Sequence, residues 1–405
     1  MRAASRVLNV ISSFFKLDLF IPSWTAGRMW LLRIGLYKLE RTKEIANDWI
    51  WIIDHTVQLG KEKCMVILGI RQGHFPKEEL HLTHEDVEPI ALIPVKQSNG
   101  DVVFQQLEEN IAKTGIPKQI VSDHGPDIIS GVKLFCQKYD TTATYDMKHK
   151  GAAIIKRELT NDPDWQQFAS NASKTGKKVQ QTKLSFMAPP NQRNKARYMN
   201  IKELVDWGTD VLCHLDLKET ENFESSEMYK KFGWMYDFRD NLKDWKCLVE
   251  IIKTANDFSN FMGLYKAMDT DLEEELSILP KNDKFAHIQE ELVIFARQQQ
   301  EKLLNDDRLL ANSEIIESVI GKYKGLQGDQ VKGGFTGTLL GLTASVSDFS
   351  METIRKAIDS TPTKKVWDWI KENVGQSVYS QRKEFRKIAK EQKQNQEENF
   401  CTVFN

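Results

Sequence analysis

The stretch WIWIIDHTVQLG, residues 49 to 60, decides the fold of this chain. Its first five residues are aromatic or β-branched, which is typical of a strand in the core of a sheet. Asp54 follows them directly. An ionised carboxylate in such a strand is costly unless a cation, hydrogen bonds or an active site compensate for its charge. The pattern therefore predicts a buried strand with a candidate functional residue, Asp54; a structural carboxylate near a strand end is the alternative.

The residues that follow predict an α/β core. Two more apolar runs and then alternating helix and strand patterns give the order β-β-β-α-β-α-β. The fourth strand, within KQIVSDHG, ends in a second aspartate, Asp123, which could alternatively cap the next helix. The later elements are expected as strands at 63 to 70, 88 to 95, 118 to 123 and 141 to 146, and as helices at 101 to 114 and 126 to 139.

The 405 residues suffice for two to four domains. Two short helices precede the strands, and in the second we expect Ser23 as the N-cap and Gly35 as the C-terminal stop. This pair suits a helix-turn-helix-like module or a plain helical hairpin. The predicted division is 1–44 helical DNA-binding module, 45–159 first part of the core, 160–305 helical insertion, 306–330 final core helix and 331–405 C-terminal helical tail.

The distribution of charge predicts a polyanionic partner, although the net charge is only −1. Binding depends on where the charges lie rather than on their sum. Residues 1 to 43 hold eight Lys or Arg against two acidic residues, and residues 165 to 202 hold eight and no acidic residue. A third basic segment, QRKEFRKIAKEQK, lies near the C-terminus.

Cysteine usage and hydropathy narrow the class further. The five cysteines are scattered and never in CxxC spacing, which argues against a disulfide framework or a zinc site and favours a reducing cytosol. No apolar run approaches the roughly 18 residues of a membrane span. We therefore expect a cytoplasmic protein with no membrane partner.

A late helix, SEIIESVIGKYK at 313 to 324, supplies a possible third carboxylate. Its isoleucines occupy one arc, and Glu314, Glu317 and Lys324 occupy the other. Two Asp and one Glu could together hold two Mg²⁺ ions for phosphodiester chemistry, since Mg²⁺ prefers hard oxygen ligands. An ordinary amphipathic helix is the alternative.

These features resemble the RNase H-like catalytic core of DDE transposases. The strand order, Asp54 on the first strand, Asp123 at the end of the fourth and the helical Glu317 match that core. Asp146 and His149, in YDMKHKGAA, are similar to a D/C-x-x-H motif that follows the fifth strand in transposase superfamilies with a large helical insertion. They would have a supporting role.

The spacing from Glu317 to Lys324 is similar to that of the IS4-type insertion-sequence signature, in which the Lys contacts a DNA phosphate. That signature has Tyr and Arg where this chain has Leu310 and Ser313. Glu314, one turn earlier on the same face, is the alternative third carboxylate.

The resemblance implies an α/β fold: an RNase H-like mixed sheet flanked by helices, with a large all-α insertion and an N-terminal helix-turn-helix-like module. It implies a DNA transposase in which Asp54, Asp123 and Glu317 hold two Mg²⁺ ions, for which Mn²⁺ can substitute. The alternatives are an RNase H-like nuclease or resolvase without strand transfer, and an inactive transposase-derived DNA-binding protein.

The implied partners are double-stranded DNA, both transposon ends and target, and further copies of the chain as a homodimer or higher oligomer. A bacterial, nucleoid-associated protein is expected. The residues expected to bind DNA are Lys324, Arg28, Arg33, Lys177, Lys178, Arg193, Lys195 and Arg197.

Overall fold

A computed structural model describes most of the chain. The described residues are 2–57, 62–76, 79–123, 125–191, 201–217, 227–303, 307–328, 335–375, 382–389 and 392. The chain divides into two compact units. Unit 1 consists of Met1–Ala143 and Ser313–Asn405, and unit 2 of Thr144–Asn312.

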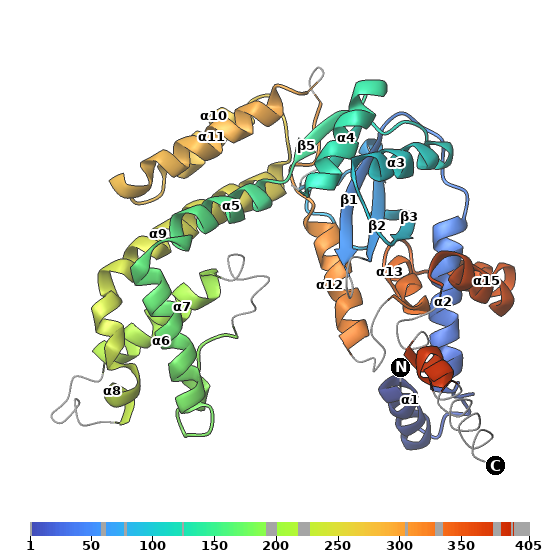
Figure 1. Cartoon of the computed structure of the whole chain (residues 1–405), viewed down its shortest axis with the longest axis horizontal. Coiled ribbons are helices and arrows are strands. Elements are labelled where there is room, and N and C mark those ends of the chain that lie inside the picture. The colour runs from blue at the N-terminus through green and yellow to red at the C-terminus, as the bar shows by residue number, and fades with distance from the viewer. Residues whose placement is uncertain are drawn as a thin grey trace, which may run out of the picture. The chain divides into compact units, whose positions relative to one another are not determined.

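A mixed five-stranded sheet is the centre of unit 1 (Figure 1). Its order is β3-β2-β1-β4-β5, with β1 antiparallel to β2, β2 antiparallel to β3, and β1 parallel to β4. The sequence-predicted order of elements is confirmed, and with it the RNase H-like α/β fold class. The strands are β1 (Trp49–Val57), β2 (Lys63–Arg71), β3 (Glu88–Val95), β4 (Gln119–Ser122) and β5 (Thr142–Tyr145).

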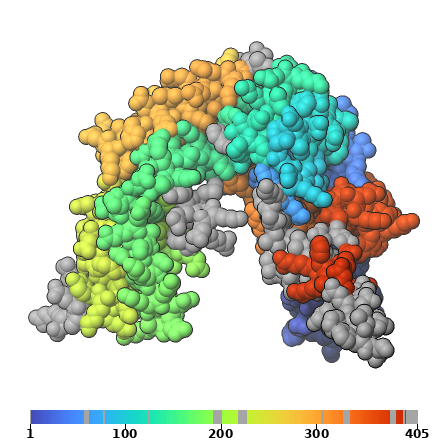
Figure 2. Space-filling view, in the orientation of Figure 1, coloured from blue at the N-terminus to red at the C-terminus, as the bar shows by residue number. Residues whose placement is uncertain are grey.

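Two helices cover one face of this sheet. They are α3 (Gly100–Thr114) and α4 (Pro126–Lys138), which pack on each other. In Figure 2 the blue-green atoms of this region form a continuous surface. Trp51 and Ile53 of β1 point to this side, because they share a buried core with side chains of both helices. Since side chains alternate along a strand, Asp54 points to the opposite face.

The opposite face is covered by α12 (Glu314–Gly328), which packs against β1. Cys64 alternates with Met65 of the α3–α4 core and therefore points to the α12 side. Burial raises the pKa of the Tyr323 phenol of α12, and the charge of the nearby Cys64 thiolate would raise it further. Cys64 therefore lies near Tyr323. The helix and Asp54 thus lie on the same side of the sheet.

The N-terminal helices are α1 (Arg2–Phe14) and α2 (Trp24–Glu40), and the C-terminal ones are α13 (Leu340–Ala344), α14 (Met351–Ser360) and α15 (Thr363–Asn373). Ser23 caps α2 as predicted, accepting a bond from Ala26 N at 3.2 Å. The prediction that Gly35 ends this helix is wrong. The helix continues to Glu40, and Gly35 instead lets α13 approach closely, because a Cβ there would overlap the carbonyl oxygen of Leu340.

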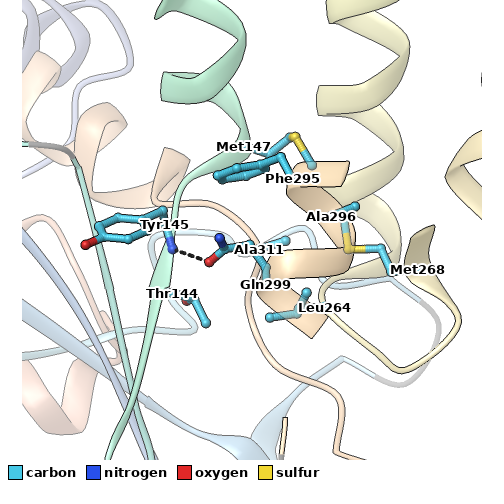
Figure 3. A pocket seen from close by; sticks show the side chains of 9 residues that line it. All are labelled: Thr144, Tyr145, Met147, Leu264, Met268, Phe295, Ala296, Gln299 and Ala311. Atoms are coloured by element: carbon cyan, nitrogen blue, oxygen red, sulfur yellow. Dashed lines mark hydrogen bonds between the residues drawn. The ribbon is translucent and has the colours of Figure 1, made fainter. Parts of the chain in front are cut away.

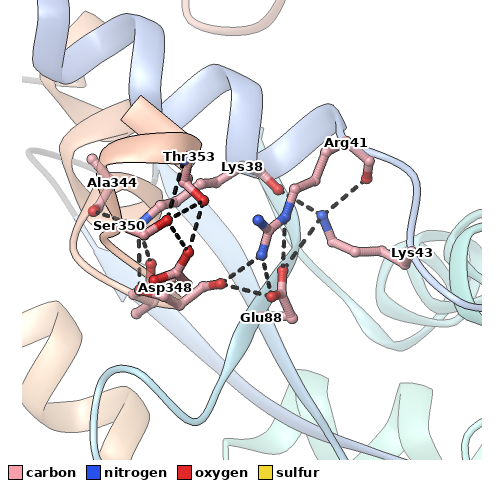
Figure 4. Close-up of polar contacts among 10 residues, drawn as sticks. Lys38, Arg41, Lys43, Glu88, Ala344, Asp348, Ser350 and Thr353 are labelled. Atoms are coloured by element: carbon pink, nitrogen blue, oxygen red, sulfur yellow. Dashed lines mark hydrogen bonds and ion pairs between the residues drawn. The ribbon is translucent and has the colours of Figure 1, made fainter. Parts of the chain in front are cut away.

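A buried lysine joins α2 to the C-terminal segment (Figure 4). The Lys38 ammonium is fully buried and donates to the carbonyl oxygens of Ala344 at 3.3 Å, Val346 at 2.6 Å and Ser347 at 3.3 Å. Burial lowers its pKa to about 8. Nearby, Glu88 of β3 accepts from Arg41 and from the Ser347 hydroxyl. These contacts make α2 part of the core of unit 1.

Unit 2 is helical apart from the last residues of β5 and an isolated bridge between Leu264 and Leu309, as far as the structure describes it. Trp165, Phe168 and Trp245 pack together at its centre. Among the helices described for the whole chain, none is both long and apolar enough to cross a membrane. The helices of unit 2 are α5 (Met147–Thr160), α6 (Pro163–Val179), α7 (Ile201–Asp216), α8 (Glu227–Phe232), α9 (Arg239–Met262), α10 (Met268–Ser277) and α11 (Ala286–Gln300).

Candidate metal centre

The register of β1 and β4 brings two predicted site residues to neighbouring positions. Ile53 pairs with Ser122 in this parallel pair, so Asp54 and Asp123 are the next residues along each chain. Asp54 points away from the α3–α4 core, because it alternates with Ile53 of that core, and Asp123 directly follows the end of β4. Neighbouring strands are about 4.8 Å apart. Two carboxylates at that spacing repel each other unless a cation lies between them.

Short backbone contacts hold each carboxylate. The Asp54 Oδ1 accepts from the His55 amide at 2.6 Å, and the Asp123 Oδ1 accepts from the Gly125 amide at 3.0 Å. A Cβ at Gly125 would lie only 3.1 Å from that Asp123 oxygen. The loop after β4 therefore follows the Asp123 side chain closely, which fixes the second carboxylate near the strand end.

A charged cluster on the other face supports the same strand ends. The Asp127 carboxylate of α4 accepts from Lys63 of β2 at 2.6 Å and lies 3.4 Å from the His55 Nδ1. That imidazole is buried, and neither ring nitrogen has an aligned hydrogen-bond partner among the residues that the structure describes. Burial lowers the pKa of His55, with Asp127 and Asp123 opposing the effect.

The same cluster stabilises the charged form of Asp127. Burial alone would raise the pKa of this carboxyl, but the hydrogen bond from Lys63 and the nearby His55 outweigh it and lower the pKa to about 2. Asp127, His55 and Lys63 are not among the site residues predicted from the sequence. The sequence points to His55 only because it directly follows Asp54. Nothing in the sequence indicates that residues 63 and 127 are in contact.

The two candidates for a third carboxylate lie in the first turn of α12. Glu314 and Glu317 both lie there and are half-buried, where the helix N-terminus favours negative charge. The structure does not bring Asp54, Asp123 and either glutamate all within 4.8 Å of one another. The helix that carries both glutamates packs on the strand that carries Asp54.

The donor set fits a hard divalent cation. Asp54 and Asp123 both offer hard oxygen donors, the ligand type that Mg²⁺ prefers. Mg²⁺ accepts one or two protein carboxylates and keeps water in its remaining positions. The two aspartates are therefore sufficient protein ligands for a first ion, with a glutamate of α12 available for a second.

The predicted DNA-binding residues differ in their surroundings. Lys324 is exposed on α12, Lys177 and Lys178 are exposed in the last turn of α6, and Arg28 is half-buried in α2. Arg33 donates to the carbonyl oxygens of Thr361, at 2.6 Å, and Ile358 at the end of α14. The other predicted residues, Arg193, Lys195 and Arg197, lie outside the described residues.

The supporting residues lie at the start of α5 in unit 2. Asp146 is fully buried and caps the helix, accepting from the Lys148 amide at 2.7 Å. His149 is half-buried in the first turn. A structural role in starting this helix therefore accounts for the Asp146 side chain within unit 2.

Two cavities among the described residues differ widely in size. In unit 2, an apolar cavity of about 10 Å³ lies beside Gln299, which accepts from the Tyr145 amide at 3.0 Å (Figure 3). That volume holds roughly one water molecule. A larger hollow of about 520 Å³ in unit 1 is lined by Trp49, Arg71 and other charged residues. Its Arg71 is already paired with Asp48 and Glu44.

Comparison with solved structures gives a distant structural likeness. No protein-family model matches the chain, and no curated protein matches it. Among solved structures, the chain is similar to the Drosophila P element transposase strand transfer complex, with 12% sequence identity and a TM-score of 0.40. The likeness covers 86% of this chain and 90% of that chain. At that score it carries no weight for the function.

Proposed function

We propose that this chain is a DNA transposase that cuts and rejoins phosphodiesters at transposon ends. The observation that carries the proposal is the neighbouring register of Asp54 and Asp123, with α12 packed on the strand that carries Asp54. Two carboxylates at neighbouring positions of adjacent strands repel each other unless a cation offsets their charge. A cation-dependent activity explains why such a pair is present.

In this proposal Asp54 and Asp123 hold divalent ions, and Glu317, or Glu314 as the alternative, completes the set. The ions supply an activated water or 3′-hydroxyl and stabilise the leaving oxygen. The residues of the chain fix the spacing: the His55 and Gly125 amides orient the two carboxylates. Exposed Lys324 binds a phosphate near the scissile bond.

DNA binding in this proposal depends on lysines and arginines that remain accessible. Lys177 and Lys178 at the end of α6 contact backbone phosphates, as do Arg28 and the predicted basic residues at 193, 195 and 197. Each phosphate contact releases counterions, so affinity falls steeply with salt. Arg33 is assigned instead to holding α14, because its guanidinium already binds two carbonyl oxygens.

The test compares nicking of supercoiled DNA by the wild-type chain and by Asp54→Asn and Asp123→Asn, with Mg²⁺ or Mn²⁺. We expect both variants to lose nicking by at least about 100-fold while retaining DNA binding. The matched control is Asp101→Asn, an exposed carboxylate in the first turn of α3, which should nick like the wild type.

Strand transfer is tested separately with precut DNA ends. A joined product supports the transposase. Nicking without any joined product supports the nuclease alternative, and DNA binding without nicking by wild type or variants supports an inactive DNA-binding protein. Either of these results contradicts the proposal.

A further inference from the structure

Helix α1 is turned with its apolar side outward. Its only buried residue is Ser12, whose hydroxyl donates to the Leu17 carbonyl at 2.7 Å. Ser5 donates to the Pro22 carbonyl at 2.9 Å. A helix on the surface of a globular protein normally packs by its apolar side and exposes its polar side. In α1, Ser5 and Ser12 face the rest of the chain.

The exposed side is large and continuous. At 100° per residue, Val7, Val10, Ile11 and Phe14 fall on one arc, which the neighbouring Leu8 and Phe15 extend. The exposed fractions are 55% for Val7, 42% for Leu8, 66% for Val10, 39% for Ile11, 78% for Phe14 and 63% for Phe15. Leu17, Leu19 and Phe20 beyond the helix are 47%, 49% and 89% exposed. We call these nine residues the α1 apolar surface.

The area of this surface matches what a stable dimer buries. With about 200 Å² for each large apolar side chain, the exposed part amounts to roughly 1,000 Å². The largest apolar patch on a typical monomer is about 300–600 Å². A standard interface buries about 800 Å² on each partner. The α1 apolar surface is therefore large enough for a specific interface and unusually large for a surface that remains in water.

We propose that the α1 apolar surface is the docking site for α1 of a second copy of this chain. The arc contains no charged residue, so two copies can meet across a twofold axis without burying a charge. The charged residues of α1, Arg2 and Arg6, lie outside the arc. In an antiparallel pair they lie at opposite ends of the interface, where they do not repel each other.

A lipid surface suits this helix less well than a second copy. Helices that lie in a membrane interface carry a strongly charged side toward water. Here the side opposite the arc carries only two charged residues, Arg2 and Arg6, and its Ser5 and Ser12 are bonded to the chain itself, so much of this side packs on the protein instead of facing water. The inference is independent of the proposed catalytic activity, because it needs neither metal nor DNA.

The test measures the mass of the full chain in solution by analytical ultracentrifugation, from about 1 to 100 μM, a range that detects a micromolar dimer. We expect a dimer for the wild type and a monomer for the double variant Val10→Asp, Phe14→Asp, with affinity at least about 100-fold weaker. The matched control is Asn9→Asp, which places the same charge on the same helix outside the arc and should leave the dimer intact.

Three results would overturn the inference. They are a wild-type chain that stays monomeric at the highest concentration, a double variant that dimerises as well as the wild type, and an Asn9→Asp control that dissociates to the same extent. A monomeric wild type that floats with phosphatidylserine vesicles would identify a lipid surface instead. Circular dichroism of each variant checks that helix content is unchanged. If the double variant loses helix content, Val10→Ser with Phe14→Ser replaces it, with the same expected monomer.

Discussion

Replacing Gly35 with alanine should destabilise unit 1 strongly, although alanine is the better helix former. Gly35 lies inside α2, and an added Cβ would overlap the Leu340 carbonyl oxygen and come within 2.9 Å of the Thr343 hydroxyl. A backbone oxygen cannot rotate away as a side chain can, so α13 must move. Overpacking of this kind costs about 1–3 kcal/mol.

The movement of α13 also breaks a hydrogen bond. Thr343 Oγ1 donates to the Gly35 carbonyl at 2.9 Å in a buried position, and the loss of such a bond costs about 1 kcal/mol. The gain in helix propensity returns about 1 kcal/mol. The net expectation for Gly35→Ala is a loss of about 1–3 kcal/mol in the free energy of unfolding of unit 1.

The matched control is Gly321→Ala in α12. This glycine is also inside a helix, but it is exposed, and no atom lies within 4 Å of an added Cβ. We expect a gain of about 0.5–1 kcal/mol. Hydrogen exchange of the α2 and β1 amides under increasing urea measures unit 1 without depending on how unit 2 unfolds. If Gly35→Ala is as stable as the wild type, the close approach of α13 is refuted.

The remaining predictions concern the site. Asp127→Asn should lower the free energy of unfolding by about 2 kcal/mol at neutral pH, because the pKa of this carboxyl is lowered to about 2 by Lys63. That contribution to stability is present above pH ~4 and is lost as the pH falls through ~2. The free energies of unfolding of variant and wild type, measured with urea, should therefore converge in acid. A difference between them that stays constant with pH would contradict the ion pair. In parallel plasmid assays, Glu317→Gln should reduce metal-dependent nicking at least about 100-fold, and Glu314→Gln should reduce it far less. A larger loss of nicking in Glu314→Gln than in Glu317→Gln would assign the third carboxylate to Glu314. Lys324→Met should weaken DNA binding and lower the slope of log affinity against log salt by about one, and an unchanged slope would exclude a phosphate contact.

The sheet could be predicted from the sequence because each strand is recognisable from a few neighbouring residues. The continuous apolar runs of β1, β2 and β3 and the helix stop at Gly115 are signals within a few residues, and the structure has these elements at nearly the predicted positions. The parallel pairing of β1 with β4 follows from the order of the elements. From that pairing, the neighbouring positions of Asp54 and Asp123 follow as well.

The contacts between distant segments could not be predicted. Gly35 has the local signature of a helix stop, and only the approach of α13, some three hundred residues later, explains why the helix continues. The Arg33 guanidinium donates to a carbonyl oxygen at the end of α14, a contact that nothing in the sequence indicates. The cluster of His55, Lys63 and Asp127 likewise joins three elements, and no periodicity or spacing indicates it.

A crystal of the chain soaked in Mn²⁺ tests the central claim most directly, through anomalous difference density. We expect a Mn²⁺ peak between the carboxylates of Asp54 and Asp123, with metal–oxygen distances of about 2.0–2.2 Å. Bound Mn²⁺ elsewhere in the crystal, together with no peak between these two side chains, would contradict it.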